Sequence, residues 1–143
     1  MGRFVNPDNS AFQVALNSKI YVDKTGLIKT LLRGEMDQVT LITRPRRFGK
    51  TMAMSMLNSF LDIRKDSREL FEGLEISKET AICERWMNQY PTLFLSFKDV
   101  YGSTFENTFN FLKYIVAEVC KQHMYLLDSD DVDKICGAFF ILP

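Results

Sequence analysis

The sequence has few of the residues expected in a secreted, membrane-spanning or metal-binding protein. It contains one histidine and three cysteines, and Cys83, Cys120 and Cys136 lack the spacing of a metal site. We therefore expect reduced, structural thiols. No apolar run approaches the roughly 20 residues that a membrane helix needs, and Met1–Ser10 has no apolar signal core. These absences predict a cytoplasmic protein that makes no use of a membrane.

An excess of charge of one sign is also absent. The 18 basic and 18 acidic residues give a formal net charge of zero. The chain as a whole is therefore not an electrostatic binder of nucleic acid, and such a role would need a local basic patch. Apolar residues make up 46% and charged residues 25%, which is ordinary for a globular protein and excludes a disordered chain. A length of 143 residues fits one domain with one core.

Apolar residues recur at helical spacing in four parts of the chain. The spacing predicts helices over residues 27–32, 50–61, 78–89 and 105–123. Asp23 stands where an N-cap would begin the first helix, and Gly34 would stop it. Pro91 would end the third helix. The apolar face expected on the last helix consists of Phe105, Phe109, Leu112, Val116, Val119 and His123. This position predicts a core or boundary role for the single histidine.

Two β-rich runs, Val39–Thr43 and Thr92–Phe97, predict buried strands. Strands separated by helical crossovers usually pair in parallel. The expected fold class is therefore α/β, with a parallel sheet flanked by helices. A complete parallel sheet usually has more than two strands, so we expect this chain to hold an incomplete domain.

The segment Thr43–Thr51, TRPRRFGKT, ends like the phosphate-binding loop G-x-x-x-x-G-K-[ST]. A predicted strand leads into it, and a predicted helix follows it. In such a loop, backbone N–H groups and the positive end of the helix dipole face an anion. Lys50 would bind the β- and γ-phosphates, and Thr51 would place its hydroxyl on Mg²⁺.

The first half of the segment departs from the motif. Arg44 stands where the motif has its first glycine, and Pro45 has no N–H to donate. Residues 47–51 all keep their amide donors, and Gly49 lets the backbone approach a phosphate closely. We therefore expect the anion-binding half to be intact. The predicted nucleotide-binding residues are Arg44, Pro45, Arg46, Arg47, Phe48, Gly49, Lys50 and Thr51.

The same segment supports other interpretations. Arg44, Arg46, Arg47 and Lys50 form a local basic patch that would suit nucleic acid or a protein partner. No interleaved aromatic residues or known reader motif accompany this patch. A basic, solvated turn is the structural alternative, and the oligomeric state is open.

Several longer segments carry a family resemblance. They are YVDKTGLI (21–28), LITRPRRFGKT (41–51), DSRELFEGLEI (66–76), YPTLFLSFKD (90–99) and, more loosely, YLLDSD (125–130). With them the sequence resembles the AAA-ATPase-like family, bacterial proteins in which a PD-(D/E)XK nuclease-like domain often follows. The resemblance implies a P-loop NTPase domain over residues 6–143 that uses ATP and Mg²⁺. It also makes Arg44 the family's own residue, because the family's loop reads RPRRFGK[ST]. It assigns no role to YVDKT.

A hydrolysing P-loop enzyme also needs a Walker B acid after a later strand to hold Mg²⁺. The resemblance places this acid after a third apolar strand, downstream of the last residue here, and the nuclease-like domain further on. Within the chain, Asp99 follows a predicted strand, and Asp128 follows a short apolar run. The sequence thus predicts an ATP–Mg²⁺-binding domain that is an ATPase if a downstream strand completes it. An inactive, truncated remnant is the other hypothesis.

Overall fold

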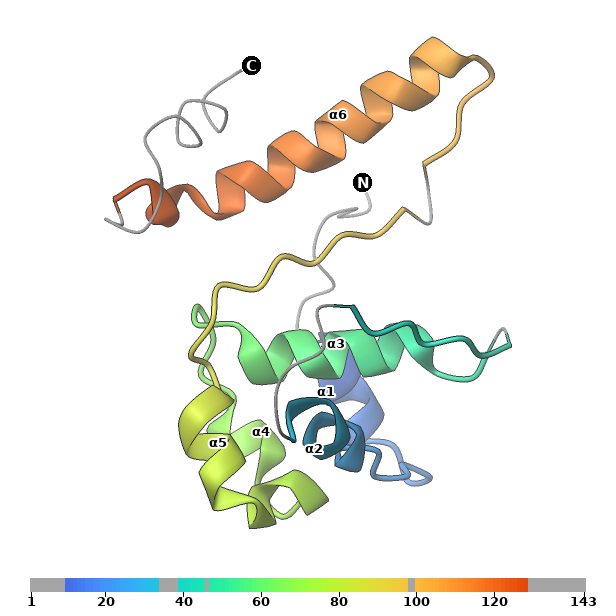
Figure 1. Cartoon of the computed structure of the whole chain (residues 1–143). Helices are drawn as coiled ribbons and strands as arrows, with labels where there is room; N and C mark the ends of the chain where they lie inside the picture. The colour runs from blue at the N-terminus through green and yellow to red at the C-terminus, as the bar shows by residue number, and fades with distance from the viewer. Residues whose placement is uncertain (1–9, 34–38, 46, 98–99, 129–143) are drawn as a thin grey trace. The chain divides into compact units, whose positions relative to one another are not determined.

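The computed structural model describes residues 10–33, 39–45, 47–97 and 100–128. Within these ranges the chain is helical (Figure 1). The elements are α1 (Ser10–Leu16), α2 (Gly26–Leu32), α3 (Lys50–Leu61), α4 (Arg68–Phe71), the 3₁₀ helix η1 (Glu75–Lys78), α5 (Thr80–Trp86), α6 (Phe105–Gln122) and the 3₁₀ helix η2 (Met124–Asp128). Contacts divide them into two compact units, with the boundary between Thr92 and Leu93.

The first unit, which contains α1 to α5, has an apolar core of its own. α1 packs against α3, and η1 packs against both α2 and α5 (Figure 1). The ring of Phe71 lies at the centre, 5.2 Å from the ring of Phe12 and 5.3 Å from that of Phe60. The buried apolar residues are Phe12, Ile28, Leu32, Met56, Phe60, Phe71, Ile76 and Trp86. Burial of each large side chain contributes roughly 1.5–3 kcal/mol, so this core holds the short helices together.

Asn88 closes the C-terminal end of α3. Its backbone is left-handed, with φ of 55°. Its N–H donates to the Phe60 carbonyl at 2.7 Å, and its side-chain amide donates to the carbonyls of Ser59 and Asp62 at 3.2 and 2.9 Å. Carbonyls at the end of a helix have no partner within it, and Asn88 supplies donors to those of Ser59 and Phe60, while the Tyr90 N–H donates to the Leu61 carbonyl at 3.0 Å.

The second unit is built on α6. Thr104 caps the helix, because its Oγ1 accepts from the Asn107 N–H at 3.2 Å. Ile115, Val119 and His123 are buried, and His123 Nδ1 lies 2.8 Å from the Val119 carbonyl. The predicted core role of His123 is confirmed.

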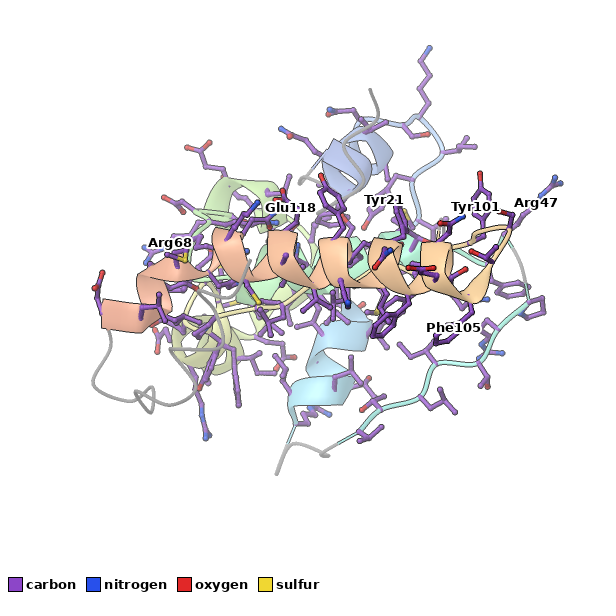
Figure 2. The ribbon with its side chains drawn as sticks, turned by 90° about the horizontal axis from the view of Figure 1, so that it is seen from above. Tyr21, Arg47, Arg68, Tyr101, Phe105 and Glu118 are labelled. Atoms are coloured by element: carbon purple, nitrogen blue, oxygen red, sulfur yellow. The ribbon has the colours of Figure 1, made fainter. Side chains whose placement is uncertain are left out.

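The first part of the predicted apolar face of α6 is exposed. Phe105 is 84% exposed, and Phe109 and Val116 are exposed as well. Figure 2 shows the Phe105 side chain beside the first turn of α6. The helix itself was predicted correctly, but periodicity alone did not show which part of its face is covered.

The predicted α/β fold is wrong for the described residues. They contain no strand and no sheet, only one isolated parallel bridge between Asp62 and Tyr90. Residues 39–43 and 92–97 have no regular structure. Val39 and Leu41 are 84% and 83% exposed, and Leu93 is 59% exposed. A strand needs a neighbour for its N–H and C=O groups, and β-rich composition did not supply one.

Some predicted helix limits also differ from the structure. The N-cap residue of α2 is Thr25, so Asp23 does not cap α2 as predicted, and its carboxylate accepts from Thr25 and from Glu75. α5 ends at Trp86, well before Pro91, because the left-handed Asn88 turns the chain first. Gly34 lies outside the described residues. The short helices α1, α4 and η1 were not predicted.

Two further expectations concern the cysteines and the membrane. Cys83 and Cys120 are free thiols, and Cys136 lies outside the described residues. Burial, together with the nearby Glu79 and Glu84 carboxylates, raises the pKa of the Cys83 thiol. In the part of the chain that the structure describes, no helix has the length and apolar character to cross a bilayer.

Candidate phosphate-binding loop

The loop before α3 has the backbone of an anion-binding turn. Arg47 and Gly49 are left-handed, with φ of 68° and 80°, and Phe48 between them is not. Alternation of hand turns successive N–H groups toward one side and forms a concave nest for an anion. A left-handed arginine costs about 1–2 kcal/mol, so the fold holds this turn against local preference. Arg46 lies outside the described residues.

The N-terminus of α3 begins at a glycine, which has no side chain to cap the helix. Gly49 is the N-cap residue, and its carbonyl accepts from the Ala53 N–H at 2.9 Å. The first turn of the helix has no acidic residue. The first N–H groups of a helix have no partner within it and carry a partial positive charge. They are therefore available to an anionic ligand.

Lys50 closes the loop across its own turn. Its ammonium donates to the Arg44 carbonyl and, at 3.0 Å, to the Pro45 carbonyl. An ammonium has three N–H donors, so one remains for a ligand. Arg44 and Pro45 thus serve the loop through their carbonyl oxygens. By sequence, both residues depart from the motif G-x-x-x-x-G-K-[ST].

The other predicted residues lie on the surface of the loop. Arg44, Arg47 and Thr51 are exposed, and Phe48 is 58% exposed. The Arg47 side chain extends away from the ribbon (Figure 2). Thr51 lies in the first turn of α3, directly after Lys50. The structure thus brings Lys50 together with the carbonyls of Arg44 and Pro45, and it leaves the side chains of Arg44 and Arg47 open to solvent.

A family model described as predicted AAA-ATPase matches residues 10–136. The chain belongs to the AAA-ATPase-like family. The match covers the loop and most of the chain, and it confirms the resemblance seen in the sequence. Comparisons with curated proteins and with solved structures gave no match.

The YVDKT segment of this AAA-ATPase-like chain is anchored on both sides of Lys24. Asp23 Oδ1 accepts from the N–H and the hydroxyl of Thr25, at 2.8 and 2.7 Å. Asp23 Oδ2 accepts from the Glu75 N–H at 2.7 Å, and Thr25 Oγ1 accepts from the Ile76 N–H at 3.2 Å. The segment is therefore fastened to the start of η1, about fifty residues further along the chain.

The charge of Asp23 fits this anchoring role. Burial raises the pKa of its carboxyl, but the hydrogen bonds from the Glu75 and Thr25 amides outweigh burial and hold the pKa below its ordinary value. Asp23 is thus a charged acceptor for the first turn of η1, where the helix dipole favours an anion. Only the folded chain brings the two segments together, so the sequence could not reveal this bond.

Lys24 reaches the phosphate-binding loop. A Cβ added to Gly49 would lie 3.8 Å from the Lys24 ammonium nitrogen. Lys24 was not among the predicted site residues, because 25 positions separate it from Gly49. The only signal in the sequence was its place inside the YVDKT segment.

The described residues offer few ligands for a metal. They include no group of three or more His, Cys, Asp or Glu side chains that would hold an ion. Asp128 ends η2 and is exposed, and Asp99 lies outside the described residues. The chemistry of the loop therefore fits Mg²⁺ only through the Thr51 hydroxyl, with the remaining ligands from a nucleotide and water, as is usual for this ion.

A separate cavity of about 450 Å³ lies in the first unit. It is lined by Arg68, Glu69, Phe71, Glu72, Ser77, Cys83, Glu84, Met87 and Gln89. No residue of the loop lines it. It carries acidic and basic groups together, so it has no clear preference for a polyphosphate.

Proposed function

We propose that this chain binds ATP, as its Mg²⁺ complex, through the loop formed by residues 44–51. The uncapped N-terminus of α3, preceded by the left-handed Arg47 and Gly49, is the observation that carries the proposal. Membership of the AAA-ATPase-like family supports it. A phosphate group binds where unpaired N–H donors, the positive end of a helix dipole and a lysine lie together. All three occur at the start of α3.

Each residue has a defined part in the proposed site. The first amides of α3 would donate to phosphate oxygens, and Lys50 would add its remaining N–H as a charged donor. Thr51 would supply a hydroxyl ligand to Mg²⁺. When bound, Mg²⁺ neutralises charge on the phosphate oxygens. Gly49 leaves the approach open, since it has no side chain above the turn.

We expect binding with at most slow hydrolysis. Hydrolysis in this class of site requires a carboxylate that helps hold Mg²⁺ and a group that orients water. The first turn of α3, directly after the loop, has no acidic residue that could serve as this carboxylate. Turnover at the rate of ordinary ATPases, abolished by Lys50→Ala, would contradict this expectation.

Calorimetric titration with MgATP tests the proposed binding. Lys50→Ala removes the charged donor and the closure of the loop, and we expect at least tenfold weaker binding. Lys19→Ala is the matched control, because Lys19 is an exposed lysine that is not part of the loop. Thermal melting without nucleotide checks that both variants are folded. Equal affinity of Lys50→Ala and the wild type would refute the site.

A second candidate function is binding of nucleic acid through the exposed Arg44 and Arg47. Their exposure is the observation that favours it. Affinity for a short DNA duplex should then fall steeply with salt, because phosphate contacts release counterions. The double variant Arg44→Ala, Arg47→Ala should lose this binding and retain MgATP binding through Lys50. Absence of DNA binding at low salt would end this alternative.

A further inference from the structure

We propose that Lys24 is a second phosphate-binding residue of the loop, alongside Lys50. This inference rests on the proposed nucleotide site and extends it to the YVDKT segment. The Lys24 ammonium lies beside Gly49, the residue from which α3 begins. The two lysines are 26 positions apart in the sequence and reach the same turn.

The backbone of Lys24 is held in place by its neighbours. Asp23 and Thr25, on either side, both accept hydrogen bonds from the first turn of η1. Thr25 is fully buried, whereas Lys24 is exposed. The anchors fix where the lysine leaves the backbone, and the side chain extends from there to the loop. Such preorganisation lowers the conformational cost of ligand binding.

The charge around the loop points to an anionic ligand. A cation beside a helix N-terminus is unfavourable, because the helix dipole is positive there. Lys24 and Lys50 nevertheless both meet the start of α3. Neither belongs to an ion pair among the residues that the structure describes. A polyphosphate would relieve this concentration of positive charge, and two ammonium groups suit its several negative oxygens.

The proposal predicts a specific pattern of affinities. Lys24→Met keeps most of the aliphatic side chain and removes the charge, so we expect MgATP and MgADP to bind about tenfold more weakly. AMP affinity should change much less, because one phosphate gives fewer negative oxygens for two lysines. Lys24→Arg keeps the charge and should restore most of the affinity. Lys19→Met, a matched loss of an exposed lysine, should bind like the wild type.

Calorimetry with ATP, ADP and AMP on the wild type, these three variants and Lys50→Ala tests the proposal. Melting temperatures without nucleotide should agree, since the Lys24 side chain is exposed and only its neighbours hold the fold. MgATP binding that Lys50→Ala abolishes and Lys24→Met leaves unchanged would overturn the role of Lys24 alone. No binding by the wild type would overturn the nucleotide site and this inference together. Equal weakening by Lys19→Met and Lys24→Met would also overturn it, because net charge would then explain the effect.

Discussion

α3 and α6, of 12 and 18 residues, begin in opposite ways. At α6, Thr104 accepts from the Asn107 amide, and Glu106 adds a negative charge in the first turn. At α3, Gly49 supplies no cap, the first turn has no acid, and Lys50 adds positive charge. Capping by the chain's own residues stabilises a helix. The open, basic start of α3 agrees with the nucleotide binding proposed above.

The two helices also differ in their burial. α3 places Met56 and Phe60 in the core of the first unit. α6 exposes Phe105 and Phe109, whose rings stack at 5.8 Å on the surface. The helix with the open N-terminus is thus the one that is fixed within its unit. A rigid support is what a preorganised binding loop requires.

Phe60→Ala, which tests the burial of α3, should lower the free energy of unfolding more than any other variant proposed here. Phe60 is fully buried and packs edge to face on Phe71. Its loss leaves a cavity, and we expect the free energy of unfolding to fall by about 3–5 kcal/mol. Urea denaturation gives the value. Phe109→Ala on α6 is the matched control and should cost less than about 1 kcal/mol, because the ring is exposed. Similar losses would show that the two helices are equally buried.

Thr25→Val should have the next largest effect. It keeps the shape of the side chain but removes the acceptor of the Ile76 N–H and the donor to Asp23. A buried N–H left without a partner costs about 1–3 kcal/mol. Thr25→Ser retains the hydroxyl and should lose less stability. If both variants unfold at the same urea concentration, these bonds do not anchor the segment that carries Lys24.

The hydrogen bonds from Glu75 to Asp23 and from Ile76 to Thr25 each join residues about fifty positions apart. The sequence could not reveal such long-range bonds. Periodicity was enough for α3 and α6, because their apolar spacing is local. The motif selects Lys50 and Gly49, and their part in nucleotide binding stays a prediction. The approach of Lys24 to Gly49 joins residues 25 positions apart and exists only in the folded chain. Residues 39–43 and 92–97 were wrongly predicted to be strands. β-rich composition gives a strand only where a neighbouring strand can pair with it.

Thr104→Ala should weaken the start of α6 by about 1 kcal/mol. The Asn107 amide would lose its acceptor and exchange with solvent several-fold faster in a hydrogen-exchange experiment. Thr104→Ser should exchange at the wild-type rate. Unchanged exchange in Thr104→Ala would mean that the cap is dispensable, and the contrast with α3 would then lose its basis.

The smallest predicted effect concerns pH at the other end of α3. Burial raises the pKa of the Asp62 carboxyl, but hydrogen bonds from Arg64, with Nη2 to Oδ2 at 2.7 Å, outweigh it and lower the pKa. A lowered pKa stabilises the fold above the pKa of an unfolded aspartate, about 3.9. The stabilisation disappears as the pH falls through the lower folded value.

Asp62→Asn should therefore cost roughly 1 kcal/mol or less at pH 7 and almost nothing near pH 2. Urea denaturation at both pH values provides the comparison. Asp66→Asn, at an exposed neighbour, should have no effect at either pH. A difference between Asp62→Asn and the wild type that persists at pH 2 would assign the effect to packing and not to charge.

An amide NMR titration with MgATP locates the ligand and so decides whether nucleotide binds at the start of α3. We expect the largest shift changes at Gly49, Lys50 and Thr51, with a smaller change at Lys24. AMP should produce weaker changes at the same amides. Changes confined to the cavity lined by residues such as Arg68 and Cys83, or no change at the start of α3, would refute binding at the loop.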